Sequence, residues 1–293
     1  MAANTRDIRR RIKSIKNTAQ ITKAMQMVAA SKMRKAQAAA LAGRPYAELM
    51  NRVLLAVSKR TNPELSPLLE VRPVKKELVL VVSTDKGLCG ALNTNLLRET
   101  NQFDSRPTAY VATGRKAVQY LARTRKELLA DFALKDAPGL LDTKPISKFM
   151  MEKFLSHEVD KVSVLYTRFI NTLVQKPTVL TLLPISPEDL PKAPTAPAAT
   201  PDKAEDDSLE FLYEPSAAEV LAGILPHYVH FQVFQMVMDA RASEHSARMV
   251  AMKSATDNAK QLVKDLTLEY NKVRQASITT ELLEISTAQM VLG

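Results

Sequence analysis

The segment at 84–90, TDKGLCG, has the residue types and the setting of a phosphate-binding loop. It follows a β-branched run and precedes a segment with helical character, which is where open α/β sheets bind anionic ligands. Gly87 and Gly90 lack the Gly-x-Gly-x-x-Gly spacing of a dinucleotide site, and no Gly-x-x-x-x-Gly-Lys-Ser/Thr motif occurs in the chain. The favoured interpretation is a tight turn, and a phosphate site is the weaker alternative. A dinucleotide-dependent oxidoreductase is disfavoured, because the dinucleotide-binding motif is absent.

The nucleophile and metal-ligand candidates form no complete set. Cys89 is the single cysteine, so neither an internal disulfide nor a multi-cysteine metal site can form, and no histidine lies nearby in sequence to generate a thiolate. His227 and His230 share a helix face, but no cysteine or nearby carboxylate completes a zinc set. We therefore predict no catalytic residue, no metal site and no cofactor.

The positive charge is concentrated at the N-terminal end. The chain carries 41 Lys and Arg against 31 Asp and Glu, a net charge of +10, yet residues 1–60 hold 14 basic residues and only Asp7 and Glu48 as acids. A basic arm of this kind suits an anionic partner, namely nucleic acid, anionic lipid or an acidic protein. The alternative is that these residues form a helix face exposed to solvent.

Composition limits the fold class. The 293 residues allow one or two domains, and 5 % aromatics, no Trp and 7 Gly disfavour an all-β protein. No apolar run approaches the roughly 20 residues of a membrane-spanning helix, and the Arg-rich start has no secretory signal pattern.

The pattern of residues 5–58 predicts a long helix. Ile8, Ile12, Ile15 and Ala19 have the spacing of one helical face, and Ile21, Met25 and Val28 form an adjacent stripe. Local rules place a break where Arg44 precedes Pro45.

Between the two ends, strands alternate with helices. This order is typical of βαβ units and a mainly parallel sheet. We predict strands at 77–83, 108–113, 127–133, 159–169 and 178–183, and helices at 91–100, 115–125 and 146–157. The proline-rich stretch 184–207 predicts a flexible loop, with order returning at 209–215.

The C-terminal segment 227–292 contains neither Gly nor Pro and predicts one long helix. A seam with alternating steps of four and three can be traced along it, interrupted by Glu269 and Thr280. Its members are Ala255, Ala259, Leu262, Leu266, Glu269, Val273, Ala276, Thr280 and Leu283. The two terminal helices could pair antiparallel, with the α/β segment inserted at one end of the rod.

Four stretches carry a specific resemblance: ITKAMQMVAASKMRK at 21–35, STDKGLCG at 83–90, SEHSARMVAMKSATDN at 243–258 and YNKVRQASITTELLE at 270–284. They resemble the gamma subunit of the rotary F-type ATP synthase, in register from about residue 7 to residue 284. The resemblance implies a long antiparallel coiled coil of both terminal helices with an inserted Rossmann-like α/β domain. It also implies a helix that continues unbroken through Pro45, and this expectation replaces the local one.

The resemblance implies a division into an N-terminal coiled-coil helix (1–60), an α/β domain (75–215) and a C-terminal coiled-coil helix (216–293). It further implies a non-catalytic rotor shaft that couples ion flow through a membrane ring to ATP synthesis or hydrolysis on the beta subunits. The expected partners are the alpha and beta subunits, the epsilon subunit and the c-subunit ring, with no nucleic acid and with membrane contact only through the complex. The expected place is the cytoplasmic face of the bacterial plasma membrane.

Residue roles follow from matching positions only. The resemblance places Met25, on the facing helix at the level of Arg248 and Gln275, against the beta subunits. The other expected beta contacts are Asp85, Lys86, Cys89, Arg248, Gln275, Thr279 and Glu281, and the expected c-ring contacts are Phe211, Tyr213 and Glu214. The tail at 286–293, STAQMVLG, departs from the Gly-Ala-rich ending of the family. The alternative function is a basic coiled-coil nucleic-acid-binding protein, which rests on the basic arm and lacks interleaved aromatics.

Overall fold

The structure is a computed structural model that describes residues 5–43, 45–46, 49–50, 53–54, 67–104, 106–185 and 216–292. The chain forms two compact units, one of residues 1–31 with 248–293 and the other of residues 32–247. Among the described helices, none has a stretch that is both long and apolar enough to span a bilayer.

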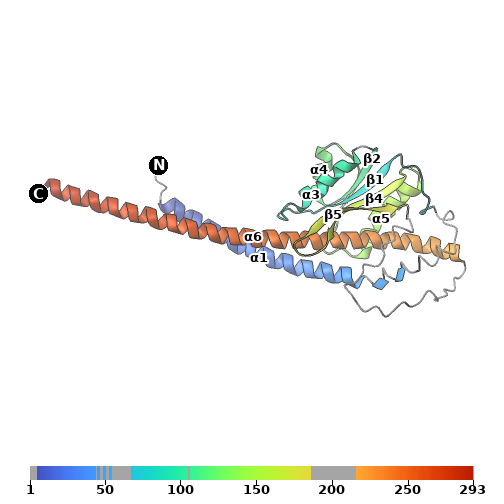
Figure 1. Cartoon of the computed structure of the whole chain (residues 1–293), viewed down its shortest axis with the longest axis horizontal. Coiled ribbons are helices and arrows are strands. Elements are labelled where there is room, and N and C mark those ends of the chain that lie inside the picture. Colours follow the sequence, from blue (N-terminus) through green and yellow to red (C-terminus); the bar gives the residue numbers. More distant parts are fainter. Residues whose placement is uncertain are drawn as a thin grey trace. The chain divides into compact units, whose positions relative to one another are not determined.

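The first unit is a pair of antiparallel helices, made by the start of α1 (Thr5–Ala42) and the end of α6 (Ala217–Leu292) (Figure 1). The inward positions of both helices advance by alternating steps of four and three, the 3.5-residue rhythm of a coiled coil. On α1 these positions are Ile8, Ile12, Ile15, Ala19, Thr22, Gln26 and Ala29. On α6 they are Met252, Thr256, Ala259, Val263, Leu266, Tyr270 and Val273.

A hydrogen bond between two threonine hydroxyls marks the register of this pair. Thr22 Oγ1 lies 2.7 Å from Thr256 Oγ1, so residue 5, where α1 begins, falls opposite residue 273. Beyond that point the placed side chains of α6 are exposed up to Met290. From residue 274 to its end at Leu292, α6 therefore runs without α1 for about 28 Å at 1.5 Å per residue.

Threonine hydroxyls along α6 donate hydrogen bonds to backbone carbonyl oxygens of the same helix. Thr279, Thr280 and Thr287 each donate a hydrogen bond to the carbonyl oxygen four residues earlier, at 2.9, 3.0 and 2.7 Å. Thr267 does the same at 2.6 Å.

The seam predicted on α6 is partly wrong, because two of its members lie one residue away from the positions that face α1. Its members at 255, 259, 266 and 273 are buried or half-buried as expected, but Leu262 and Glu269 are exposed and their neighbours Val263 and Tyr270 point inward. Two adjacent stripes have the same spacing here, and the contact with α1 selects between them. The predicted members at 276, 280 and 283 are exposed because they lie past the start of α1, and the stripe residues Ile21 and Val28 are exposed as well.

The expectation of an unbroken helix through Pro45 is wrong, because α1 ends at Ala42 and Gly43 lies in a turn. Pro45 has no N–H to continue the hydrogen-bond ladder and disfavours a helical residue before it. Gly43 also packs closely, since a Cβ there would lie 3.1 Å from the ring of Phe231. The local rule was right, and the family-based expectation was not.

The second unit is built on a five-stranded sheet in the order β3-β2-β1-β4-β5. Its strands are β1 (Glu77–Val82), β2 (Thr108–Thr113), β3 (Glu127–Phe132), β4 (Lys161–Phe169) and β5 (Gln175–Leu183). The first four strands pair in parallel, and β5 adds antiparallel at one edge, where Pro177 can be tolerated. This order confirms the inserted, mainly parallel α/β domain.

Helices cover both faces of the sheet (Figure 1). One face packs against α3 (Leu92–Arg98), the short 3₁₀ helix η2 (Glu99–Phe103) and α4 (Arg115–Arg123). The other face packs against α5 (Leu140–Leu155) and the part of α6 that belongs to this unit. Every residue of β1 is buried, as expected of a central strand between two helical layers.

Several boundaries moved from their predicted places. The helix expected at 146–157 begins at Leu140, because the Asp142 carboxylate accepts a hydrogen bond from the Gly139 N–H at 2.9 Å and favours an earlier start, and Pro145 is tolerated within it. The helix expected at 91–100 gives way to η2 after Arg98. The strand expected at 178–183 begins three residues earlier, and the proline-rich loop lies, from residue 186 onward, outside the described residues.

Two side-chain contacts tie helices to other parts of this unit. Lys32 Nζ of α1 donates to Asp136 Oδ2 at 2.7 Å, and this hydrogen bond holds the pKa of the Asp136 carboxyl below its ordinary value. His230 Nδ1 of α6 lies 2.5 Å from Ser147 Oγ of α5, and both side chains are buried. Burial is the main cause that lowers the pKa of His230, with Lys144 and His227 adding to it.

We expect Gly114→Ala to lower the free energy of unfolding by about 3 kcal/mol or more. Gly114 has φ +87°, and a Cβ there would lie 2.4 Å from the Ser83 carbonyl oxygen. The control is Gly87→Ala, where nothing lies within 4 Å of the added carbon. Denaturant unfolding of the full chain measures both, and equal stabilities for the two variants would contradict this account of Gly114.

We expect protonation of His230 to weaken the fold as the pH falls. The folded pKa lies below the unfolded value of about 6.5, so the contribution of neutral His230 is complete above pH 6.5 and is lost as the pH drops toward the folded value. Unfolding free energy should therefore decline from pH 7.5 to 5.5 in the wild type, and more weakly in His230→Gln. A slope in His230→Gln as steep as that of the wild type would refute the assignment.

Candidate functional site

The first candidate site is the carboxyl edge of the sheet between β1 and β4, where the strand order reverses. Open α/β sheets bind ligands in the crevice at this point. After β1 come Ser83, Thr84 and Asp85, all tied into the fold: the Ser83 hydroxyl donates to the Thr113 carbonyl at 3.0 Å, and the Thr84 hydroxyl donates to the Lys86 carbonyl at 2.8 Å.

The side chain of Arg241, from α6, fills this crevice. It is 6 % exposed; its Nη1 donates to Glu244 Oε2 at 2.9 Å, and its Nη2 lies 3.7 Å from Asp85 Oδ2. The same Nη2 lies 3.4 Å from the carbonyl oxygens of Leu134 and Lys135. One guanidinium thus contacts the turn after β1, the segment after β3 and its own helix.

The space that Arg241 leaves has a volume of about 10 Å³. Thr113 and Thr167 line it, and their hydroxyl oxygens have no hydrogen-bond partner among the described residues. A volume of this size with two polar groups suits one water molecule and is far too small for a nucleotide. This crevice therefore has no room for a nucleotide, and of the 84–90 turn only Thr84 lines it.

The three residues predicted from this turn to contact beta subunits have different exposures. Asp85 Oδ1 accepts a hydrogen bond from the Arg115 N–H at 3.1 Å, at the start of α4, and Oδ2 faces Arg241. Cys89 is buried, and its Sγ accepts a hydrogen bond from Asn93 Nδ2 at 3.3 Å. Lys86 is exposed.

The predicted contacts on the helix pair do not lie at one level. Counting from the Thr22–Thr256 pair, Met25 falls opposite residue 253, about 7 Å along the axis from Arg248 and about 33 Å from Gln275. The expectation that Met25 lies level with both is therefore wrong for Gln275. Met25 and Arg248 are half-buried, whereas Gln275, Thr279 and Glu281 are exposed on the part of α6 beyond α1. Phe211, Tyr213 and Glu214 lie outside the described residues.

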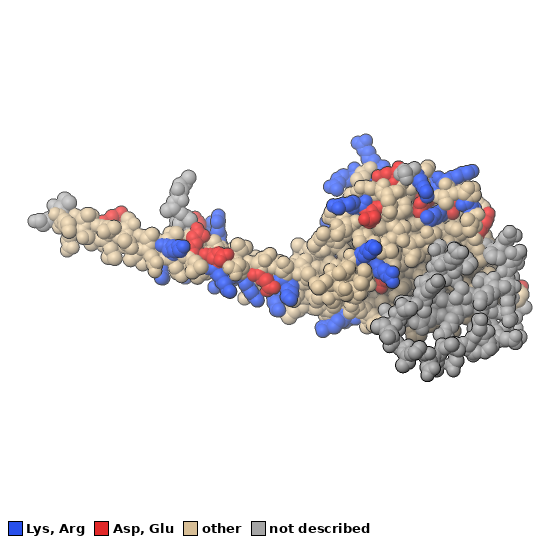
Figure 2. All heavy atoms as spheres, viewed as in Figure 1, with Lys and Arg blue, Asp and Glu red and all other residues tan. Residues whose placement is uncertain are grey.

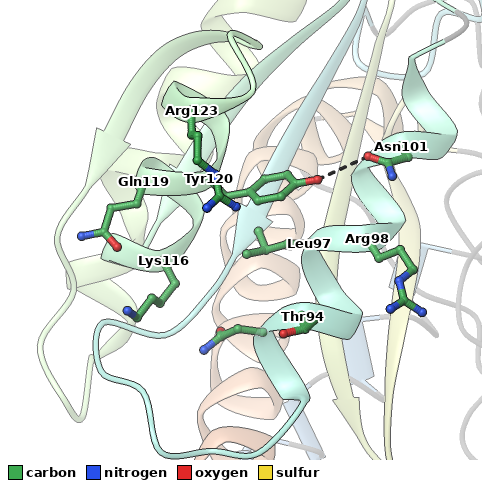
Figure 3. Close-up of a pocket in the computed structure, with 9 residues that line it drawn as sticks. Thr94, Leu97, Arg98, Asn101, Lys116, Gln119, Tyr120 and Arg123 are labelled. Carbon is green, nitrogen blue, oxygen red and sulfur yellow. Dashed lines mark hydrogen bonds between the residues drawn. The ribbon is translucent and has the colours of Figure 1, made fainter.

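A third feature, which the sequence analysis missed, is an open groove between α3 and α4 (Figure 3). Its volume is about 590 Å³, and three cationic side chains project around it. We call it the α3–α4 groove; its lining residues are Asn93, Thr94, Leu97, Arg98, Asn101, Lys116, Gln119, Tyr120 and Arg123. In the sequence, the sign of this groove is the lack of acidic residues at its lining positions. That sign can be recognised only once the fold shows that α3 and α4 lie side by side.

Together these elements define a class of protein: two long terminal helices that pair antiparallel, with an α/β domain inserted between them. Residues 4–292 match a family model described as ATP synthase. The chain is 52 % identical over 296 residues to the ATP synthase gamma chain of Methylacidiphilum infernorum, covering 99 % of this chain and 100 % of that one. It is 50 % identical over 297 residues to the gamma chain of Opitutus terrae, covering 98 % of each. The chain belongs to the family of ATP synthase gamma chains.

Solved structures show the same fold. A chain of the Euglena gracilis mitochondrial ATP synthase matches with a TM-score of 0.67 at 20 % identity, covering 98 % of this chain and 94 % of that one. A chain of the Tetrahymena thermophila mitochondrial ATP synthase central stalk and c-ring structure matches with a TM-score of 0.59 at 24 % identity, covering 80 % and 99 %. The family resemblance seen in the sequence is confirmed, and these relatives do not support the nucleic-acid-binding alternative.

We expect Arg241→Met to lower the free energy of unfolding by about 3 kcal/mol or more, because it leaves the Glu244 carboxylate buried without its guanidinium. The double variant Arg241→Met, Glu244→Leu should recover most of that loss, since no charge then remains stranded. Denaturant titrations of both single variants and the double variant give the coupling energy.

The control is Lys148→Met, which removes an exposed partner of Glu152 on α5 and should change stability by less than about 0.5 kcal/mol. Additive effects in the Arg241 and Glu244 variants would show that the two side chains do not act as a pair.

Proposed function

We propose that this chain is the central rotor shaft of an F-type ATP synthase. In this role it is a non-catalytic subunit that couples ion flow through a membrane ring to ATP synthesis or hydrolysis on the beta subunits. The observation that carries the proposal is the relation over nearly the whole chain to ATP synthase gamma chains at about half identity. The expected partners are the alpha, beta and epsilon subunits and the c-subunit ring.

The free end of α6 supports this role physically. Beyond residue 273 it exposes Ile278, Leu282, Leu283, Ile285 and Met290, which are between 48 % and 82 % exposed. Figure 2 shows few charged side chains over this end of the helix. A single helix with this much exposed apolar surface needs a partner that covers it. A surrounding ring of alpha and beta subunits would supply that cover.

Under this proposal residues 1–60 and 216–293 provide the shaft, and residues 75–215 provide the domain that faces the membrane ring. Met25, Arg248, Gln275, Thr279 and Glu281 would contact the beta subunits. Asp85, Lys86 and Cys89 would bring that turn to the beta subunits, and of the three Lys86 has the exposed side chain. Phe211, Tyr213 and Glu214 would contact the c ring.

The bacterial relatives support a place at the cytoplasmic face of the plasma membrane, as a peripheral subunit of a proton-translocating complex. Membrane contact would then arise only through the complex.

Reconstitution tests the role directly. We expect the purified chain to show no ATPase activity, to co-elute with a hexamer of alpha and beta subunits, and to be required for ATP-driven proton pumping when that hexamer is joined to a membrane sector in vesicles. Co-elution with nucleic acid at low salt, without assembly into the hexamer, would favour the rival function instead.

Alanine at Gln275, Thr279 and Glu281 together should leave the free energy of unfolding within about 1 kcal/mol of wild type, because all three side chains are exposed. In the assembled enzyme the same variant should lower proton pumping per ATP hydrolysed severalfold. Lys264→Ala, another exposed change on α6, is the control for general damage to the helix. Wild-type coupling in the triple variant would remove these residues from the contact.

A further inference from the structure

The α3–α4 groove has a charge pattern that the packing of the domain does not require. Arg98 and Arg123 lie in the last turns of α3 and α4, where the helix dipole favours cations. Lys116 is the second residue of α4, at the end where the dipole disfavours a cation. A lysine in that position gains nothing from its own helix.

No carboxylate lines the groove, and none of these three cations forms an ion pair with any described residue. Arg123 instead lies over the ring of Tyr120, with its Cζ 5.9 Å from the ring centroid. Figure 2 shows Lys and Arg side chains, with Asp and Glu side chains among them, over the edge of the domain where α3 and α4 lie. The groove therefore presents three positive charges to whatever occupies it.

The rest of the lining is suited to a polypeptide backbone. Gln119 of α4 and Asn101 of η2 bring side-chain amides to the lining, and the Tyr120 hydroxyl of α4 lies 3.4 Å from Asn101 Oδ1, so that one hydrogen bond joins the two sides of the groove (Figure 3). Leu97 forms a buried apolar floor. Small-molecule sites are usually enclosed, whereas this groove is open, and all of its lining residues except Leu97 have side chains with polar groups.

We propose that the α3–α4 groove binds an acidic, extended segment of a neighbouring polypeptide in the assembled complex. Carboxylates of the segment pair with Arg98, Lys116 and Arg123, and its backbone accepts and donates hydrogen bonds at Gln119 and Asn101. The proposal rests on the proposed function in one respect, namely that the occupant belongs to another subunit of the same enzyme. It assigns a contact on the face of the sheet opposite α5.

The test places a photo-cross-linking amino acid at Gln119, which is exposed on the groove, in the complete assembled enzyme. A second preparation carries the same group at Lys176, an exposed position on β5 outside the groove. We expect the Gln119 probe to cross-link to a peptide of another subunit in which Asp and Glu outnumber Lys and Arg, and mass spectrometry identifies that peptide. A cross-linked peptide without an acidic excess, or no cross-link to any other chain, overturns the proposal.

Charge removal provides the matched comparison. Arg98→Ala, Lys116→Ala and Arg123→Ala together should reduce the Gln119 cross-link about tenfold, because three exposed ion pairs are lost. Arg106→Ala, Arg168→Ala and Lys176→Ala together remove three exposed cations outside the groove and should leave it unchanged. Equal reduction in both sets would show a general charge effect and overturn the assignment.

A small anion is the competing occupant. If millimolar inorganic pyrophosphate protects Lys116 from amine-directed labelling while the Gln119 probe captures no acidic peptide, the groove is an anion site and the proposal falls. ATP-driven proton pumping is measured on the same preparations. If proton pumping is normal but the Gln119 probe does not cross-link, only the proposal for the groove is refuted. If the enzyme does not assemble with this chain, the proposed function is refuted.

Discussion

The antiparallel register of α1 against α6 decides how much of α6 is left without a partner. That register is marked by the hydrogen bond between Thr22 and Thr256, in a seam that is otherwise mostly aliphatic. Burial of those aliphatic side chains, at about 25 cal/mol per Å², holds the two helices together but favours one register only weakly. A polar pair inside it contributes specificity, because any slip would leave both hydroxyls without each other. The length of α6 that extends past α1 follows from this register.

In the second unit, one side chain occupies the place where related sheets bind ligands. Arg241 stands in the crevice between β1 and β4 and joins the turn after β1 to α6 through Asp85 and Glu244. A nucleotide at that position would have to displace a buried guanidinium from its carboxylate. The crevice that binds ligands in other open α/β sheets is therefore used here to attach the sheet to α6.

The sequence predicted best where one physical signal acted alone. The apolar run after Glu77 and the strand at 108–113 have no competing interpretation, and the structure places strands there. The edge strand β5 was predicted to start too late because its first residues, Gln175, Lys176 and Pro177, are not typical of strands and the β-branched and apolar run begins only at Thr178. The inward stripe of α6 was misassigned at Leu262 and Glu269 because a neighbouring stripe has the same period, and only the opposite helix distinguishes them. The α3–α4 groove and the role of Arg241 could not be predicted, since both depend on which segments the sheet brings together.

The threonines on the free end of α6 affect how that surface would behave against moving walls. Because the hydroxyls of Thr279, Thr280 and Thr287 already donate to their own helix, each shows its surroundings a methyl group and an oxygen that can only accept. Directional donors would hold the helix at particular angles and make the energy uneven around a full turn. At these three positions and at the aliphatic side chains beside them, the contact energy therefore changes gradually with angle. In a turning shaft, contacts that favour particular angles are then left to exposed polar side chains on this end such as Gln275 and Glu281.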